Sequence, residues 1–436
     1  MPESTAADPW ATLRALPLGQ RLELTDVEGR AWTGTVIPAH ELSAPRVLTL
    51  KLDTGYNVGI RVGERTRFRL LGAPPPSRSP VTGEPPAPPS AGGVALLTTG
   101  GTIASRVDYE TGAVKPVQGE AEILALYPEL REAGSLHVRP VMDVLSENLG
   151  PGHWVTLAEE VAGAFREGAE GVVIAHGTDT LGFTAAGLSF LLADLPGPVV
   201  LVGAQRSPDR PSSDGPSNVH AAVQVARDRR LGEVVVVMHD GLSDGRFAIH
   251  RGPWVRKMHS SRRDAFRSRN APPIGVVEGG KLQLSAPVRA PTGGPARVDG
   301  PLDLRGGLLW SYPGLEPARA AAFAEGLRGV VLAGTGLGHI AQDHLDWIGA
   351  ARDRGVVVAM TTQCLEGIVD PFVYATGREL LARGVLYLDD LLPETAYAKL
   401  LWALGHADRA EEVRALMLRD RAGEFVRRRP LGEGPA

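Results

Sequence analysis

The chain has 436 residues, 43% of them apolar, and a formal net charge of −4 at pH 7. This length allows two or three domains with buried cores. The negative charge excludes a general attraction of the whole chain to nucleic acid, so any nucleic acid partner has to be bound locally or through another subunit.

A single cysteine, Cys364, excludes an internal disulfide and a cysteine-based metal site. No apolar run is long enough to cross a membrane, and the N-terminal stretch MPESTAADPW lacks the basic start and apolar core of a secretory signal. These features predict a cytoplasmic protein without a membrane anchor.

Residues 1–72 have the pattern of β structure. RLELTDVEG, AWTGTVIPA and VLTLKLDTGYNVGIRV alternate apolar and polar residues, which predicts short strands separated by glycine turns. So many strands in so few residues predict a small β-barrel of the SH3 or Tudor type. It could be an interaction module or a stabilising appendage without a ligand. The proline-rich residues 73–92 that follow predict a partly extended linker.

Apolar strands and helical segments alternate after the linker. VALLTT, GVVIAHGTDT, PVVLVGAQ and EVVVVMHDG predict strands of a first α/β domain over residues 93–295, with helices in WVTLAEEVAGAFREG and LGFTAAGLSFLLADL. A second domain over residues 296–436 has predicted strands in GLLWSYPG, GVVLAGTGLG and VVVAMTTQ and a late helix in PETAYAKLLWALG. The alternation predicts a two-domain α/β fold with parallel sheets covered by helices.

Polar residues gather at the predicted carboxyl ends of these strands, where open α/β sheets bind ligands. One strand ends in Gly100-Gly101-Thr102 and another in His176-Gly177-Thr178-Asp179-Thr180. Thr102 and Thr178 occupy equivalent places on different strands. We therefore expect both hydroxyl groups to face one pocket.

A threonine hydroxyl is a poor nucleophile until a base removes its proton. A desolvated lysine can be that base, and Asp179 could hold such a lysine beside Thr178. Lys257, in VRKMHSSRRDAF, is the first lysine after Lys115. These residue types predict the nucleophile, base and orienting carboxylate of a catalytic triad.

Structural roles explain some of the same residues. Gly100-Gly101 could be a turn with positive φ, Thr102 a helix N-cap, and Asp179 the N-cap of the following helix. His176 is better interpreted as a hydrogen-bonded structural histidine than as a catalytic one. No lysine has the spacing of a phosphate-binding loop, and the histidines lack metal-ligand spacing, so we expect no metal site.

The motifs TTGGTIAS, HGTDT, VGAQRSPDRPSSDGPSN and PETAYAKLLWALG together resemble the bacterial-type L-asparaginase/glutaminase family over residues 93–425. The resemblance implies two α/β domains, an active site near their junction and a threonine nucleophile that attacks a side-chain amide. It also implies roles for particular residues of this chain.

By this resemblance Thr102 is the nucleophile, with Thr178 as its rival, and Tyr109 contacts it from a lid. Asp179 and Lys257 are the partners of Thr178. An ungapped match would put His250 at the lysine position, but KMHSSRRDAF favours Lys257. The implied substrate-binding residues are Ser146, Glu147, Gly101 and Gly177.

Within that family the chain resembles the D subunits of archaeal-type glutamyl-tRNA(Gln) amidotransferases. The likeness rests on the β-barrel with its linker, GAQRSPDRPSSD, RKMHSSRRDAFRS and Ser146-Glu147-Asn148. It implies ammonia release from L-glutamine or L-asparagine to a GatE-type subunit, which binds the tRNA, ATP and Mg. It also implies a homodimer core and no cofactor in this chain. The alternatives are a free-standing cytoplasmic L-asparaginase and a catalytically silent scaffold.

Overall fold

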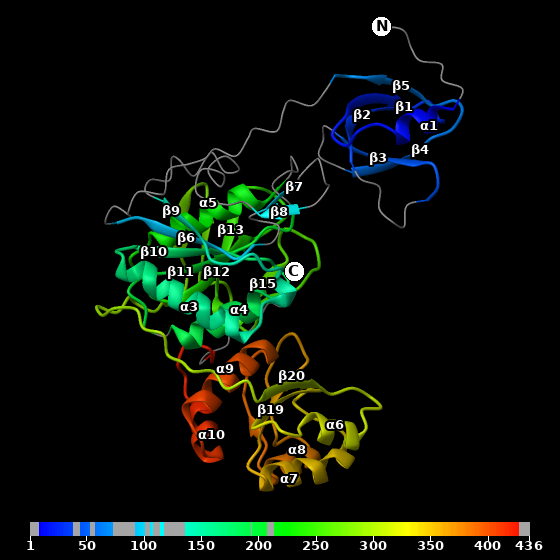
Figure 1. Cartoon of the computed structure of the whole chain (residues 1–436). Coiled ribbons are helices and arrows are strands. Elements are labelled where there is room, and N and C mark those ends of the chain that lie inside the picture. Colours follow the sequence, from blue (N-terminus) through cyan, green and yellow to red (C-terminus); the bar gives the residue numbers. More distant parts are fainter. Residues whose placement is uncertain are drawn as a thin grey trace.

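The computed structural model describes residues 8–37, 44–52, 57–72, 92–100, 105–107, 114–116, 136–192, 194–206 and 213–426. They form an N-terminal β domain and two α/β units (Figure 1). The predicted linker at residues 73–92 lies outside the described residues except for Gly92.

The N-terminal domain is a five-stranded antiparallel sheet in the order β4-β3-β2-β1-β5. A short helix precedes it, and the elements are α1 (Pro9–Arg14), β1 (Arg21–Thr25), β2 (Ala31–Val36), β3 (Val47–Leu52), β4 (Asn57–Arg61) and β5 (Arg67–Leu70). Alternate residues of the strands point inward, so that Leu22, Leu24 and Leu50 are buried in a core of the domain's own. The prediction of an N-terminal β domain is confirmed.

The first α/β unit contains an eight-stranded sheet in the order β17-β16-β13-β12-β11-β10-β6-β9. Its strands are β6 (Val94–Thr98), β9 (Leu136–Pro140), β10 (Gly171–Ala175), β11 (Val199–Val202), β12 (Val234–His239), β13 (Arg246–Arg251), β16 (Gly275–Glu278) and β17 (Lys281–Leu284). The five strands from β12 to β9 are parallel; the sequence predicted β6, β10, β11 and β12 but not β9. Strands β13, β16 and β17 extend the sheet in antiparallel fashion.

Helices cover both faces of this sheet because its strands are apolar on both sides. Helices α3 (Pro151–Arg166) and α4 (Leu181–Leu191) pack on the face that contains Leu97 and Ile174. Helix α5 (Gly215–Ala226) packs on the opposite face.

Two hairpins and two turns complete the unit. The hairpins are β7 (Ser105–Val107) with β8 (Val114–Pro116) and β14 (Val255–Lys257) with β15 (Phe266–Ser268); the turns are η3 (Ser146–Asn148) and η4 (Gly252–Trp254). The hairpin β14–β15 carries Lys257 and is anchored in the core by Val255, Ala265 and Phe266, which are at most 2% exposed.

The second α/β unit is a parallel four-stranded sheet in the order β18-β19-β20-β21. Its elements are β18 (Gly306–Trp310), α6 (Pro317–Phe323), β19 (Gly329–Gly334), η5 (Gln342–His344), α7 (Leu345–Asp353), β20 (Val357–Thr362), α8 (Ala375–Ala382), β21 (Leu386–Tyr387), α9 (Pro393–His406) and α10 (Ala410–Leu418). Helices α6, α7 and α8 cover one face of the sheet, and α9 covers the other.

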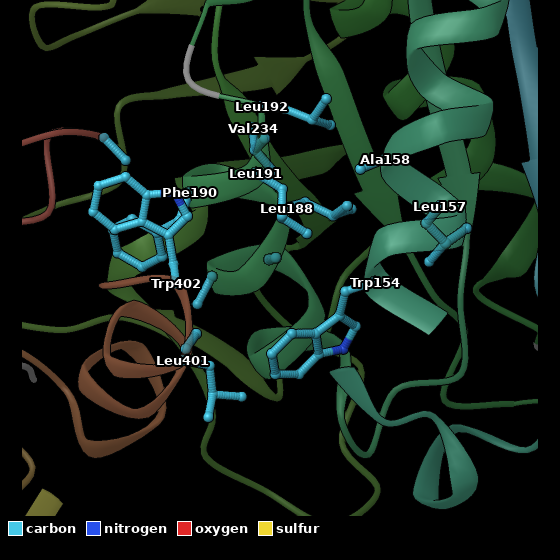
Figure 2. Packing of buried hydrophobic residues seen from close by; sticks show 14 of the residues in the cluster. Trp154, Leu157, Ala158, Leu188, Phe190, Leu191, Leu192, Val234, Leu401 and Trp402 are labelled. Atoms are coloured by element: carbon cyan, nitrogen blue, oxygen red, sulfur yellow. The ribbon is translucent and has the colours of Figure 1, made fainter. Parts of the chain in front are cut away.

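Helix α9 also packs on α4 of the first unit, so one apolar core continues across both units. The rings of Phe190 on α4 and Trp402 on α9 are stacked, with their centroids 6.3 Å apart (Figure 2). Leu401 and Trp402 face the side of α4 opposite Trp154 of α3. This shared core fixes the second unit against the helix that follows the HGTDT motif.

Candidate active site

Three residues predicted to act together meet at the carboxyl end of β10. The Lys257 ammonium donates to Thr178 Oγ1 at 2.8 Å and to Asp179 Oδ1 at 2.7 Å. The Lys257 side chain is 15% exposed, whereas that of Asp179 is 66% exposed. The structure therefore places a largely buried amine between a hydroxyl and a carboxylate that is open to solvent.

The turn η3 supports this strand end from the side. Ser146 is buried, its Oγ accepts a hydrogen bond from the Asp179 N–H at 3.3 Å, and its carbonyl accepts one from Thr180 Oγ1 at 2.5 Å. Glu147, the next residue of the turn, is exposed. Two of the predicted substrate-binding residues thus lie on one turn beside Thr178 and Asp179.

Close packing explains two of the glycines. A methyl group at Gly177 would lie 2.8 Å from both Cβ and Oγ of Ser146, so only glycine lets the two segments approach. A methyl group at Gly203, which follows β11, would lie 2.7 Å from Thr178 Cγ2. The contact between Gly203 and Thr178 was not predicted from the sequence, although VGAQ was identified as a strand end.

Three predicted residues lie outside the described part of the chain: Gly101, Thr102 and Tyr109. The strand that leads to them is described. The end of β6 lies beside the end of β10, since the Thr99 N–H donates to the Ala175 carbonyl at 3.1 Å. Gly100 then turns the chain with φ of +92°, which favours glycine.

Two buried histidines, His176 beside Gly177 and His250 within β13, make no hydrogen bond to Lys257 in the described part of the chain. His176 Nδ1 lies 2.6 Å from the Gly177 carbonyl and its Nε2 lies 2.9 Å from Thr184 Oγ1. His250 Nδ1 lies 2.9 Å from Ser268 Oγ. Burial lowers the pKa of each histidine to about 4, so both imidazoles are neutral at pH 7. It is Lys257, rather than His250, that the structure places against Thr178.

The predicted N-cap role of Asp179 is not observed. Helix α4 begins at Leu181 with Thr180 at the N-cap position, and no side chain caps it. The Asp179 carboxylate binds Lys257 instead. The ammonium is the stronger partner because a charged donor gives the stronger hydrogen bond.

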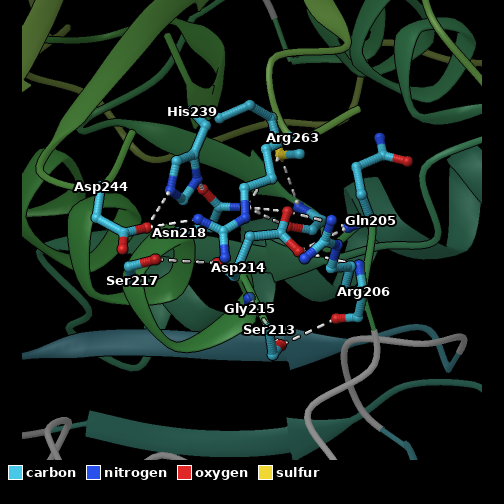
Figure 3. A network of polar contacts seen from close by, with 12 residues as sticks. Gln205, Arg206, Ser213, Asp214, Gly215, Ser217, Asn218, His239, Asp244 and Arg263 are labelled. Atoms are coloured by element: carbon cyan, nitrogen blue, oxygen red, sulfur yellow. Dashed lines mark hydrogen bonds and ion pairs between the residues drawn. The ribbon is translucent and has the colours of Figure 1, made fainter. Parts of the chain in front are cut away.

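A buried polar network holds the neighbouring strand ends (Figure 3). The Asp214 carboxylate is fully buried at the start of α5 and accepts from the N–H groups of Gln205 and Arg206 at 2.9–3.1 Å. Asn218 Nδ2 donates to the Asp214 carboxylate, and Asn218 Oδ1 lies 2.6 Å from His239 Nδ1. The network links the end of β11 to the end of β12 at the same edge of the sheet as Thr178.

The second unit contacts the segment that carries Lys257. Arg256 forms an ion pair with Glu394 of α9, with Nε 3.1 Å from Oε1, and Thr395 Oγ1 donates to the Pro253 carbonyl at 2.6 Å. Arg269, just after β15, donates to the Leu365 carbonyl at 3.0 Å. The position of Lys257 thus depends on both units.

Within the described ranges, no group of three or more His, Cys, Asp or Glu side chains is arranged to hold a metal ion. Among the helices in that part of the chain, none is long and apolar enough to cross a membrane.

Models of three protein families match the chain. They are "Asparaginase, N-terminal" at residues 93–289, "Glutaminase/Asparaginase C-terminal domain" at residues 307–417 and "GatD N-terminal domain" at residues 18–71. The D subunit of glutamyl-tRNA(Gln) amidotransferase from Methanopyrus kandleri is 45% identical over an alignment 430 residues long that covers 96% of this chain and 93% of that protein. The corresponding protein of Pyrococcus horikoshii is 44% identical, over 92% of each chain.

The chain belongs to the GatD family, the D subunits of glutamyl-tRNA(Gln) amidotransferases, within the asparaginase family. Among solved structures, the L-asparaginase of Thermococcus kodakarensis has a TM-score of 0.71 and 36% identity, over 76% of this chain and 99% of that one. L-asparaginase I of Vibrio cholerae has a TM-score of 0.66 and 30% identity, over 77% of this chain and 100% of that one. These matches confirm the predicted fold and the prediction of a GatD protein within an amidohydrolase family.

Proposed function

We propose that this GatD family member hydrolyses the side-chain amide of L-glutamine or L-asparagine by a threonine nucleophile. The released ammonia is used by a GatE-type partner that converts Glu-tRNA(Gln) to Gln-tRNA(Gln). The observation that carries the proposal is the contact of Lys257 with both Thr178 Oγ1 and Asp179 Oδ1. A hydroxyl hydrogen-bonded to an amine, which is in turn hydrogen-bonded to a carboxylate, is the arrangement that activates a nucleophile.

Lys257 has the role of a proton acceptor in this mechanism. In its neutral form the amine accepts the Thr178 proton across the same 2.8 Å contact, while the Asp179 carboxylate keeps the amine in place at 2.7 Å. The low exposure of Lys257 keeps water from competing for its nitrogen.

The reaction has two steps. A threonine oxygen attacks the carboxamide carbon, the nitrogen takes up a proton and leaves as ammonia, and water then releases glutamate or aspartate. We assign the first attack to Thr102, by its place in the GGT motif, with Thr178 as the relay to Lys257. Backbone N–H groups at the glycine-rich strand ends would stabilise the developing oxyanion. Ser146 and Glu147, on the turn beside Asp179, would bind the α-carboxylate and α-amino groups of the substrate.

Similarity along the whole chain supports the amidotransferase role. The GatD relatives match more than nine tenths of the chain, and the GatD N-terminal domain matches residues 18–71. The L-asparaginases match about three quarters of it. A free-standing asparaginase is the second candidate, since this chain matches 99–100% of the length of those two L-asparaginases.

The test of the catalytic proposal is Lys257→Met, which keeps an unbranched side chain one atom shorter and removes the amine. Loss of a general base lowers turnover by roughly 10²–10⁴-fold, so we expect kcat for ammonia release to fall by that factor. Lys281→Met is the matched control because Lys281 lies exposed on β17, and it should retain wild-type turnover. Turnover of Lys257→Met within a few fold of wild type would contradict the role of Lys257.

The test of the amidotransferase role is ammonia release from each amino acid, with and without a GatE-type subunit loaded with Glu-tRNA(Gln) and ATP. We expect low activity alone and strong stimulation by the loaded partner. Full asparaginase activity that the partner leaves unchanged would establish the free-standing enzyme instead.

A further inference from the structure

A buried carboxylate lies in the loop that closes the Lys257 hairpin. Asp264 precedes β15, and its side chain is 3% exposed. Arg262 binds it with two hydrogen bonds, Nε to Oδ1 at 2.9 Å and NH2 to Oδ2 at 2.7 Å, and Arg267 NH2 binds Oδ2 at 2.5 Å. Two guanidinium groups on one buried carboxylate fix the loop strongly because a planar fork also fixes orientation.

These ion pairs continue into the main sheet. Arg267 NH1 donates to the Asp240 carbonyl, just after β12, at 3.1 Å. Asp240 Oδ2 accepts from Arg246 Nε on β13 at 2.7 Å, and Arg246 NH1 pairs with Glu278 on β16 at 2.8 Å. Alternating charges thus run from the hairpin loop to the antiparallel part of the sheet.

The hairpin geometry transmits this restraint to Lys257. In the β14–β15 ladder Lys257 is the direct partner of Phe266, and the next bond of the hairpin runs from the Met258 N–H to the Ala265 carbonyl at 2.6 Å. Asp264 adjoins Ala265. Val255 at the base of the hairpin and Phe266 at the loop end of its ladder are buried in the apolar core, whereas Asp264 holds the loop itself against the sheet.

We infer that Asp264 is a positioning residue for the reaction: through Arg262 and Arg267 it holds the β14–β15 hairpin so that Lys257 Nζ stays between Thr178 and Asp179. The inference rests on the proposed role of Lys257. Asp264 itself touches none of these three groups through the contacts described above, so it acts only through the hairpin.

The chain offers a matched control in Asp303 of the second unit. Its carboxylate is also bound by two arginines, Arg305 through Nε at 3.0 Å and NH2 at 2.6 Å, and Arg328 through NH1 at 2.8 Å. It precedes β18 and belongs to no hairpin that carries a predicted catalytic residue. Asp303→Asn therefore removes the same kind of interaction elsewhere.

The experiment compares ammonia release by Asp264→Asn and Asp303→Asn in the full chain, well below the melting temperature of either variant. Misplacement of a catalytic group by about 1 Å costs up to ~100-fold in rate, so we expect Asp264→Asn to lower kcat by roughly 10–100-fold with little change in KM. Asp303→Asn should keep both constants near wild type. An equal kcat for the two variants would overturn the inference.

A double variant separates positioning from general loss of structure. If Asp264 acts through Lys257, adding Asp264→Asn to Lys257→Met should lower kcat no further, because both changes remove the same contribution. If the effects multiply, Asp264 acts in another way and the inference fails. If Lys257→Met itself is fully active, the proposed function fails first, and the two failures are thus distinguishable.

A second variant covers the case in which Asp264→Asn does not fold. Arg267→Gln leaves Asp264 bound to Arg262 but cuts the connection to Asp240. Arg267 is 37% exposed, so its replacement is compatible with folding. We expect the same selective fall in kcat, and a wild-type kcat in this variant would also count against the inference.

Discussion

A fully buried ion pair near the C-terminus gives a stability prediction that can be worked out from the structure. Lys399 on α9 donates to Glu424 Oε1 at 2.5 Å and to the Arg419 carbonyl at 2.7 Å, and neither side chain of the pair is exposed. The Phe425 ring lies over the ammonium at 4.6 Å. Lys399→Met preserves most of the side-chain volume. Of the contacts described for the Glu424 carboxylate, it leaves only the hydrogen bonds from the backbone N–H groups of Arg421 and Ala422.

The magnitude follows from the unpaired charge. Removing one member of a buried ion pair costs about 3–5 kcal/mol, because the remaining charge stays desolvated. We expect Lys399→Met to lower the free energy of unfolding by that amount. The double variant Lys399→Met with Glu424→Gln should recover at least about 1 kcal/mol, since no charge is then left buried.

Guanidinium unfolding followed by tryptophan fluorescence is the assay, because Trp254 and Trp402 lie next to this segment. The exposed pair Arg319–Glu316 gives the control: both side chains are more than 60% exposed, and Arg319→Gln should change stability by less than about 1 kcal/mol. A loss below about 1 kcal/mol in Lys399→Met, or strictly additive single effects, would refute the reasoning.

Two further predictions concern Gly177 and His250. Gly177→Ala puts a methyl group 2.8 Å from Ser146 and should lower kcat/KM by roughly 10–100-fold. Gly152→Ala is the control, because a methyl group there meets open space, and it should keep wild-type turnover. Equal kinetics of the two variants would contradict the packing argument. Burial lowers the pKa of His250 to about 4, so between pH 6.5 and 4 the unfolded chain binds a proton that the folded chain does not, and stability rises with pH in that window. His250→Asn should therefore lose about 3 kcal/mol less than wild type on acidification from pH 6.5 to 4, and parallel stability curves would refute this.

The main features of the fold were predictable because strand and helix patterns are local. The parallel strands other than β9 and β21, and helices α3, α4 and α9, follow directly from apolar periodicity. Helix α5 was missed because Asp214-Gly215-Pro216 has the composition of a turn, yet proline is also favoured in the first turn of a helix. The antiparallel strands β13, β16 and β17 were missed because their pairing depends on tertiary contacts.

The candidate site was predictable where the residue type itself carries the chemistry. Thr178, Asp179 and Lys257 were predicted to act together, and the structure brings them into contact. Sequence alone could not choose firmly between His250 and Lys257, because η4 inserts a turn between β13 and β14 and shifts the spacing. Asp264 could not be predicted, because nothing in RRDAF shows that its carboxylate is buried.

The last described residues have a consequence for biosynthesis. The Glu424 carbonyl accepts a hydrogen bond from Trp254 Nε1 at 3.2 Å, and Trp254 lies three positions before Lys257. The segment that carries Lys257 is therefore translated about 170 residues before the segment that braces it. A nascent chain that has not yet reached residue 393 lacks both this brace and helix α9. We therefore expect the proposed hydrolysis to begin only after Glu424 has been synthesised and this brace has formed.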